Sequence, residues 1–340
     1  MNIKVKFKKQ NFYFSENTIV VSAWILTLLG LISLLIWSSA YGGPFSALKY
    51  ANSIRAGRDI GINNRYSFFM KMIPFGQIGF YFFFSLLFTR KTFSNLLGFL
   101  ISAIVTILYI LANSSRMHMV LLFVILFLIY KLNTKIKKRD YIFFGIGSIS
   151  ALLIMSSAES ILNVLQGTNA SIQIKFNIFK VLAEEFFFPL TSLQVYLKNS
   201  PPIRLHFDLV SAILAWFPSS FRPDSLIKLE VFNTLLWKKT LLFGGLPTDI
   251  VTTSLYELHF LGPIVLPFMY GIIARNFNDR YSNTKEYHSS YQIVVKLLGS
   301  FYILKAIPYN SYDNIMTNIF NLVFSILTIK LISFFERNQL

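Results

Sequence analysis

The chain has 340 residues, of which 54% are hydrophobic and only 14% are charged, whereas soluble domains carry about 25% charged residues. Its mean hydropathy of +0.55 and its 36 phenylalanines exclude a single soluble core and a disordered chain, and they indicate lipid as the solvent. The net charge of +17 does not indicate a nucleic-acid partner, because the basic residues punctuate apolar runs. The chain has no cysteine, which excludes disulfides and thiolate metal sites, and four histidines argue against a His-rich metal site.

Apolar runs long enough to cross a bilayer as helices recur along the chain. We expect eight of them, at residues 18–39, 67–89, 93–112, 117–132, 141–157, 254–274, 289–307 and 314–334. The first is too long for the core of a cleavable signal peptide and is typical of a signal anchor. The alternation of a membrane β-strand is absent. The sequence therefore predicts an all-α, polytopic membrane bundle of about 8–10 spans, with residues 1–340 forming a single membrane domain.

The distribution of lysine and arginine predicts the orientation. With the N-terminus inside, the short inner segments hold 16 of the 32 basic residues. The much longer outer segments hold 13, and the positive-inside rule is most dependable for short loops. We therefore expect both termini to be cytoplasmic.

This topology leaves residues 158–253 as one long outer segment, and such length is improbable for a loop without structure or function. Residues 176–197 and 207–217 within it are apolar and predict interfacial or re-entrant helices. An extra pair of spans is the alternative. No internal repeat is found, so an inverted-repeat transporter gains no support.

Arginines are unexpectedly frequent on the predicted outer face. They are Arg55, Arg58, Arg65, Arg116, Arg204 and Arg222. Guanidinium binds phosphate through bidentate hydrogen bonds, so several arginines on one face indicate an anionic ligand, most economically a diphosphate. The alternatives are contacts with lipid headgroups and, for Arg58, a local pair with Asp59. We expect headgroup contacts for Lys71 and Lys305, near the outer ends of their spans.

Two outer carboxylates stand out, Asp249 and Glu257, which share a helical face because they are eight residues apart. Glu257 begins a span, where a carboxylate is costly and should be paired or functional. Either group is a candidate general base, and an ion pair of Glu257 with Lys305 is the alternative. His259 is a weaker candidate for the site.

No phosphate loop, dinucleotide fingerprint or HExxH motif is present. The sequence therefore indicates no nucleotide, metal or other cofactor, and the energy of any reaction has to come from the substrate. A substrate linked to a lipid diphosphate meets this requirement, because diphosphate is a good leaving group.

Four segments resemble the Wzy-type O-antigen and oligosaccharide repeat-unit polymerases. GGLPTDIVTTSLYELHFLGPIVLPFMYGIIAR (244–275) is similar to their late signature, and NSSRMHMVLLFVILFLIYKL (113–132) to their Gly-Ser-Arg turn. WFPSSFRPDSL (216–226) is similar to a Pro- and Arg-bearing stretch late in their large outer loop. YGGPFSALKYANSIRAGRD (41–59) is similar to their first Arg-bearing outer loop. The segments occur in the family's order over residues 20–275.

The resemblance implies a GT-C-type glycosyltransferase of the bacterial inner membrane, with residues 158–253 as a large periplasmic loop. It would polymerise repeat units on undecaprenyl diphosphate, with lipid-linked oligosaccharide as donor and acceptor, and a chain-length regulator protein is a further expected partner. Arg116 and Arg222 match motif arginines that bind diphosphate, whereas Arg55, Arg58 and Arg65 match only the loop. Related ligases place a histidine near the start of the 244–275 motif, where this sequence has Thr248 and Asp249, so Asp249 is a better match for a base than His259. An O-antigen ligase and a lipid-linked oligosaccharide flippase remain as alternatives.

Overall fold

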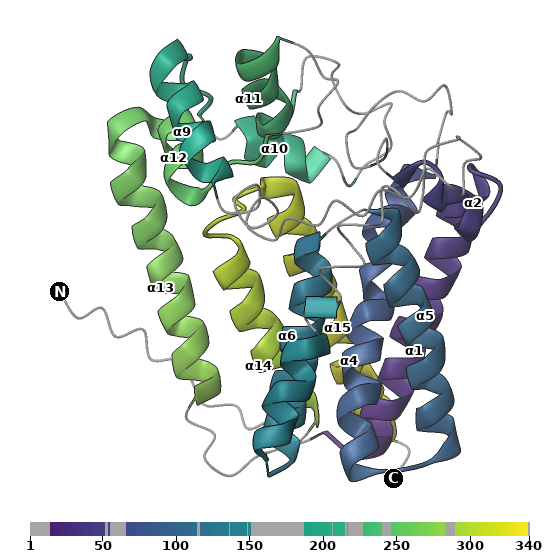
Figure 1. Ribbon diagram of the computed structural model, residues 1–340. Helices are drawn as coiled ribbons and strands as arrows, with labels where there is room; N and C mark the ends of the chain where they lie inside the picture. The colour runs from purple at the N-terminus through teal and green to yellow at the C-terminus, as the bar shows by residue number, and fades with distance from the viewer. Residues whose placement is uncertain are drawn as a thin grey trace.

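A computed structural model describes residues 14–51, 54, 66–113, 116–135, 137–147, 149–150, 187–205, 207–214, 216, 227–239, 246–282 and 290–338. Every regular element in these ranges is a helix (Figure 1). The prediction of an all-helical fold is thus confirmed for this part of the chain, and five helical segments are long and apolar enough to cross a membrane, as expected for a helical membrane protein.

The core of the bundle is formed by long helices that bury apolar side chains against one another. They are α1 (Glu16–Ser39), α4 (Pro74–Thr89), α5 (Phe93–Ala112), α6 (Arg116–Asn133), α14 (Ser290–Lys305) and α15 (Tyr312–Asn338). The short elements α2 (Pro44–Leu48) and η1 (Ser67–Lys71) precede α4. The most extensive packing between two helices is that of α1 against α4, and α5 packs against both.

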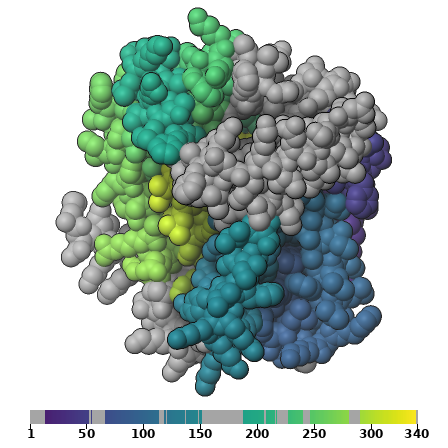
Figure 2. All heavy atoms as spheres, in the orientation of Figure 1, coloured from purple at the N-terminus to yellow at the C-terminus, as the bar shows by residue number. Residues whose placement is uncertain are grey.

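One helix, α13 (Gly262–Ser282), stands at the edge of the bundle (Figure 1). Between it and α6 lies α14, which contacts both, and the yellow C-terminal region is visible there in Figure 2. Apolar side chains of α13 such as Ile264 and Phe268 are more than 60% exposed. A helix this long with such a surface is suited to lipid rather than water.

Most of the predicted spans correspond to helices of the structure. Segments Glu16–Ser39, Ser67–Thr89, Phe93–Ala112, Ile250–Asp279 and Tyr312–Asn338 coincide with five of the eight. The predicted spans at 117–132 and 289–307 are helices, α6 and α14, but the 16 residues of α14 fall short of the about 20 needed for a straight crossing. The span at 141–157 lies partly outside the described residues.

Four shorter helices form a layer across one end of the bundle, which we call the outer layer (Figure 1). They are α9 (Phe188–Asn199), α10 (Phe207–Leu214), α11 (Leu229–Lys238) and α12 (Ile250–Leu258). Of these, α9 overlaps the end of the predicted interfacial or re-entrant segment 176–197, and α10 lies inside the predicted segment 207–217. At 12 and 8 residues, α9 and α10 are too short to cross a bilayer, which favours that interpretation over an extra pair of spans.

The ends of the bundle can be assigned from contacts. Ser15, which caps α1, donates a hydrogen bond to Glu336 near the end of α15 at 2.9 Å, so both lie at one end of the molecule. The outer layer and the first residues of α15 lie at the other end (Figure 1). Predicted inner and outer segments therefore separate to opposite ends, while the side of the membrane that each faces remains a prediction.

Glycines allow the close approach of α1 and α4. A Cβ on Gly30 would lie 2.3 Å from the backbone nitrogen of Gly76, and one on Gly79 would lie 2.3 Å from Thr27 Oγ1. Small residues let membrane helices pack at short distance, where dispersion contacts and not a hydrophobic force hold them together. Gly262 similarly brings the start of α13 against the Ser254 carbonyl of α12.

Candidate functional site

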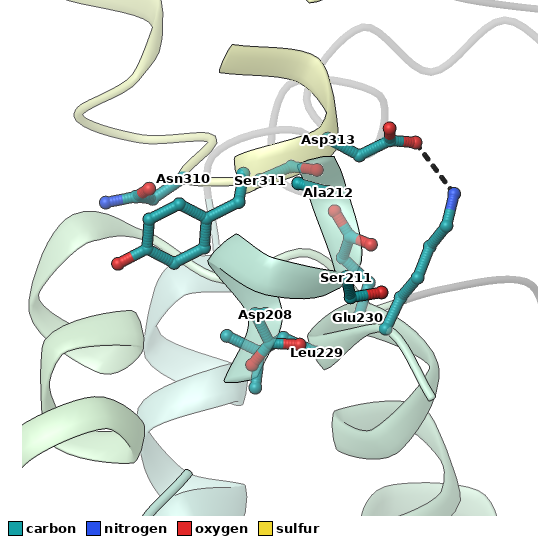
Figure 3. A pocket seen from close by; sticks show the side chains of 10 residues that line it. Asp208, Ser211, Ala212, Leu229, Glu230, Asn310, Ser311 and Asp313 are labelled. Atoms are coloured by element: carbon teal, nitrogen blue, oxygen red, sulfur yellow. Dashed lines mark hydrogen bonds and ion pairs between the residues drawn. The ribbon is translucent and has the colours of Figure 1, made fainter. Parts of the chain in front are cut away.

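A small open pocket, which we call the junction pocket, lies where the outer layer meets the start of α15 (Figure 3). It has about 310 Å³ of empty space, a volume that includes space open to solvent. Three chain segments line it: α10 with Asp208, Ser211 and Ala212; the start of α11 with Lys228, Leu229 and Glu230; and the residues at the start of α15, Asn310, Ser311, Tyr312 and Asp313.

The first carboxylate of the pocket, Asp208, is held by Arg204. The Arg204 guanidinium donates to both carboxylate oxygens at 2.7 and 2.9 Å and to the Ile227 carbonyl at 2.6 Å. Its planar group also lies 4.7 Å from the ring centre of Phe232. Only 10% of the Arg204 side chain is exposed. The sequence predicts Arg204 as a substrate-binding residue, whereas these contacts give it the role of joining α10 to α11.

The second carboxylate, Asp313, joins the bundle to the outer layer. Lys71 of η1 lies 2.5 Å from one carboxylate oxygen and Lys228 of the outer layer lies 2.7 Å from the other. Lys71 also lies 5.4 Å from the ring centre of Trp216. Lys71 therefore has a partner within the protein, where the sequence suggested a lipid headgroup.

The third carboxylate, Glu230, is in the first turn of α11 and partly exposed at the pocket. Burial raises the pKa of its carboxyl, while the Ser311 hydroxyl and the charge of Lys228 oppose that shift. No ion pair of Glu230 occurs among the described residues, in contrast to Asp208 and Asp313. The pocket thus contains one carboxyl group whose burial favours its protonated form.

Asn310 lines the pocket on the side away from Asp313 (Figure 3). Asn310 is 1% exposed, and its Nδ2 and Oδ1 have no hydrogen-bond partner among the described residues. Within the same part of the chain, the buried Tyr312 hydroxyl has no partner either. Buried polar groups in proteins are nearly always hydrogen-bonded, so these atoms call for an explanation.

The two carboxylates favoured from the sequence have different environments. Asp249 is the N-cap of α12: its carboxylate accepts hydrogen bonds from Val251 N, Thr252 N and Thr252 Oγ1 at 2.7, 3.1 and 2.6 Å. These bonds satisfy the orphan amides of a helix start. Glu257 is fully buried and does not line the junction pocket. The geometry therefore gives Asp249 a capping role and separates Glu257 from the pocket.

His259 and Lys305 also have partners inside the protein. His259 Nδ1 lies 2.9 Å from the Tyr196 hydroxyl, between α12 and α9. Lys305 Nζ lies 2.8 Å from His118 Nε2 of α6. The Lys305 ammonium thus bridges α14 and α6, where the sequence suggested Glu257 or a headgroup as its partner.

The other predicted arginines lie outside what the structure describes. Arg55, Arg58, Arg65 and Arg222 are not among the described residues. Arg116 is the first residue of α6, but its side chain is not described. Their convergence on one ligand stays a prediction.

Comparison of the chain with protein-family models, with curated proteins and with solved structures gave no match. The sequence did not single out Glu230, Asn310 or Tyr312. The available signal is that Glu230 is a carboxylate within the short, mostly apolar segment 227–233.

Proposed function

We propose that the chain is a membrane glycosyltransferase that polymerises oligosaccharide repeat units carried on undecaprenyl diphosphate at the periplasmic face of the bacterial inner membrane. The observation that carries the proposal is the set of four motifs, in the family's order, within an all-helical membrane protein. O-antigen and capsule are the two product classes that such a reaction supplies.

The arrangement of the bundle is compatible with this chemistry. The junction pocket lies between the outer layer and the bundle end where α6 and α15 begin (Figure 1). A lipid-linked substrate keeps its tail in the bilayer and its diphosphate near the interface. Arg116 begins α6 at this end, so its guanidinium is the first candidate to stabilise the charge that develops on the leaving diphosphate.

The proposal is tested by deleting the gene in the native strain and separating the surface polysaccharide on a gel. We expect the ladder to collapse to one repeat unit on the lipid A core. Loss of every band, including the single unit, would indicate ligation or flipping instead. An unchanged ladder would show that the protein does not take part in the synthesis of this polysaccharide.

Complementation of the deletion strain with variants tests the role of Arg116. Arg116→Ala should fail to restore long chains while the protein accumulates normally in the membrane. Arg139→Ala is the matched control, because the Arg139 side chain is 80% exposed. Arg139 directly precedes the apolar segment 141–147 and is far in sequence from every residue that lines the junction pocket. Normal chain length in the Arg116→Ala strain would take Arg116 out of the site.

A further inference from the structure

Exposed lysines gather in two turns at the end of the bundle opposite the outer layer. One turn joins α4 to α5, and the other follows α6 and leads into the helical residues 138–147. The sequence contains no aspartate or glutamate between residues 60 and 139, so no acid lies near these lysines in the preceding chain. The lysines, which we call the basic surface, are Lys91, Lys131, Lys135, Lys137 and Lys138.

Contacts between helices bring the two turns together. The ring centre of Phe88, near the end of α4, lies 5.8 Å from that of Tyr130, near the end of α6. Arg90 in the first turn donates a hydrogen bond to Asn17 Oδ1 at the start of α1. The two turns therefore form one surface at the end of the molecule where α1 begins (Figure 1).

The protein itself does not neutralise these lysines. The neighbouring arginines have partners, since Arg90 bonds Asn17 and Arg139 lies 3.7 Å from the Asp140 carboxylate. Asp140 also accepts a hydrogen bond from the Lys137 backbone N–H at 2.8 Å, which caps the start of the helical residues 138–147. In the described part of the chain, none of the five lysines forms an ion pair with a carboxylate. Their charge is thus available to a group outside the protein.

Exposed apolar side chains begin a short distance from the lysines. Phe144 packs on α6, with its ring centre 4.9 Å from that of Phe127, whereas Phe143 is 75% exposed. Phe143 follows Lys138 by five residues, which is about 7.5 Å along a helix. The headgroup layer of one leaflet is about 5–7.5 Å thick. Lysines at headgroup depth therefore lie next to a phenylalanine at the depth of the acyl chains.

We propose that the basic surface binds the headgroups of anionic phospholipids, with the acyl chains against the exposed phenylalanines beside it. Phe93, which follows Lys91 in the first turn, is 80% exposed and offers the same combination. A soluble acidic protein is complementary to the lysines alone, whereas an anionic lipid is complementary to the lysines and to the phenylalanines. The basic surface lies far from the junction pocket, so this binding is independent of the proposed reaction.

The test uses the full-length protein in an uncharged detergent. Phosphatidylglycerol and phosphatidylcholine with the same acyl chains are added separately, and bound lipid is counted by native mass spectrometry. We expect the wild type to bind phosphatidylglycerol at lower concentration than phosphatidylcholine. The triple variant Lys135→Gln/Lys137→Gln/Lys138→Gln should weaken the binding of phosphatidylglycerol by about tenfold or more and leave that of phosphatidylcholine unchanged.

A second triple variant is the matched control. Lys198→Gln/Lys238→Gln/Lys239→Gln removes the same charge from exposed lysines of the outer layer and should bind phosphatidylglycerol as the wild type does. Raising the ionic strength from about 0.1 M to about 1 M shortens the Debye length from about 10 Å to about 3 Å. This change should weaken the binding of phosphatidylglycerol by the wild type and have little effect on the first triple variant.

Three results would overturn the proposal. Equal binding of the two lipids by the wild type would leave only acyl-chain contacts. Equal binding of phosphatidylglycerol by the wild type and the first triple variant would place the lipid elsewhere, and an equal loss in both triple variants would be an effect of net charge. Should the first triple variant melt below the wild type, Lys135→Gln and Lys138→Gln are measured singly, and salt-independent binding by the wild type then decides against the proposal. The polymerase proposal stands in each case, because the gel of surface polysaccharide tests it separately.

Discussion

At the scale of single residues, Glu230 and Asp249 are two carboxylates at helix starts with opposite surroundings. Asp249 accepts three hydrogen bonds from its own helix, whereas Glu230 faces a pocket and is partly desolvated. Sequence position alone does not distinguish them, because both precede apolar helical segments. The two carboxylates differ in what packs against them. Removing the charge of Glu230 should therefore stabilise the protein, whereas removing the Asp249 side chain should destabilise it.

The raised pKa of Glu230 has a consequence for stability. Because burial raises the pKa above its ordinary value of 4.5, the folded chain holds this proton more tightly than the unfolded chain. The resulting stabilisation is fully present below pH 4.5 and is lost as the pH rises through the folded-state pKa. Glu230→Gln, which is neutral at every pH, should therefore melt at a higher temperature than the wild type at pH 7.5, and the two should converge in acid. Melting curves in detergent measure this, and a less stable variant at pH 7.5 would contradict it.

Asp249 should behave as a cap. Asp249→Ala removes the acceptor of two amides and one hydroxyl and should cost about 1 kcal/mol of stability. Asp249→Asn keeps a capping oxygen and should retain both near-native stability and activity. Unfolding curves and the restoration of long chains in the deletion strain check this for both variants. A stable but inactive Asp249→Asn protein would restore Asp249 as a candidate base.

At the scale of elements, the helices long and apolar enough to cross a membrane were predictable because length and apolarity suffice to define them. The ranges 18–39, 67–89, 93–112 and 314–334 lie within a residue or two of observed helical segments or inside them. The site was not predictable in the same way. Lys71 and Asp313 are 242 residues apart, so no local pattern could pair them. The assignment of Lys71 to a headgroup followed from its position near the outer end of a predicted span.

The glycine contact between α1 and α4 should be intolerant of any side chain. In Gly30→Ala the new Cβ would meet the Gly76 backbone, which cannot rotate away, so the helices must separate. We expect a loss of about 1–3 kcal/mol, as for other overpacked sites. Gly271→Ala, on α13, is the matched control, because a Cβ there has no neighbour within 4 Å. Thermal unfolding and gel filtration in detergent compare the two, and equal behaviour would mean that α1 and α4 do not pack through these glycines.

At the scale of the whole molecule, Asp313 joins two parts that the chain order keeps apart. Its carboxylate contacts Lys71 of the bundle and Lys228 of the outer layer. Asp313→Asn leaves both lysines facing a neutral group and should cost about 1.5–3 kcal/mol, the range for hydrogen bonds to charged groups. Asp279→Asn is the control, since that carboxylate is 63% exposed and its pair with Arg275 spans 3.8 Å. Limited proteolysis should cleave the outer layer faster in Asp313→Asn alone. Equal cleavage in both variants would show that Asp313 does not hold the layer in place.

The orientation of the molecule is open to a direct test because the chain has no native cysteine. Lys198, exposed near the end of α9, belongs to the outer layer, and Lys91 is exposed between α4 and α5 at the opposite end. The distribution of basic residues predicts that the outer layer faces the periplasm. A membrane-impermeant maleimide should therefore label Lys198→Cys in cells with a permeabilised outer membrane, and Lys91→Cys only after the inner membrane is opened. The reverse pattern would invert the molecule and place the junction pocket in the cytoplasm. Because lipid-linked repeat units are polymerised on the periplasmic side in the family that the sequence resembles, that result would also remove the pocket from the proposed reaction.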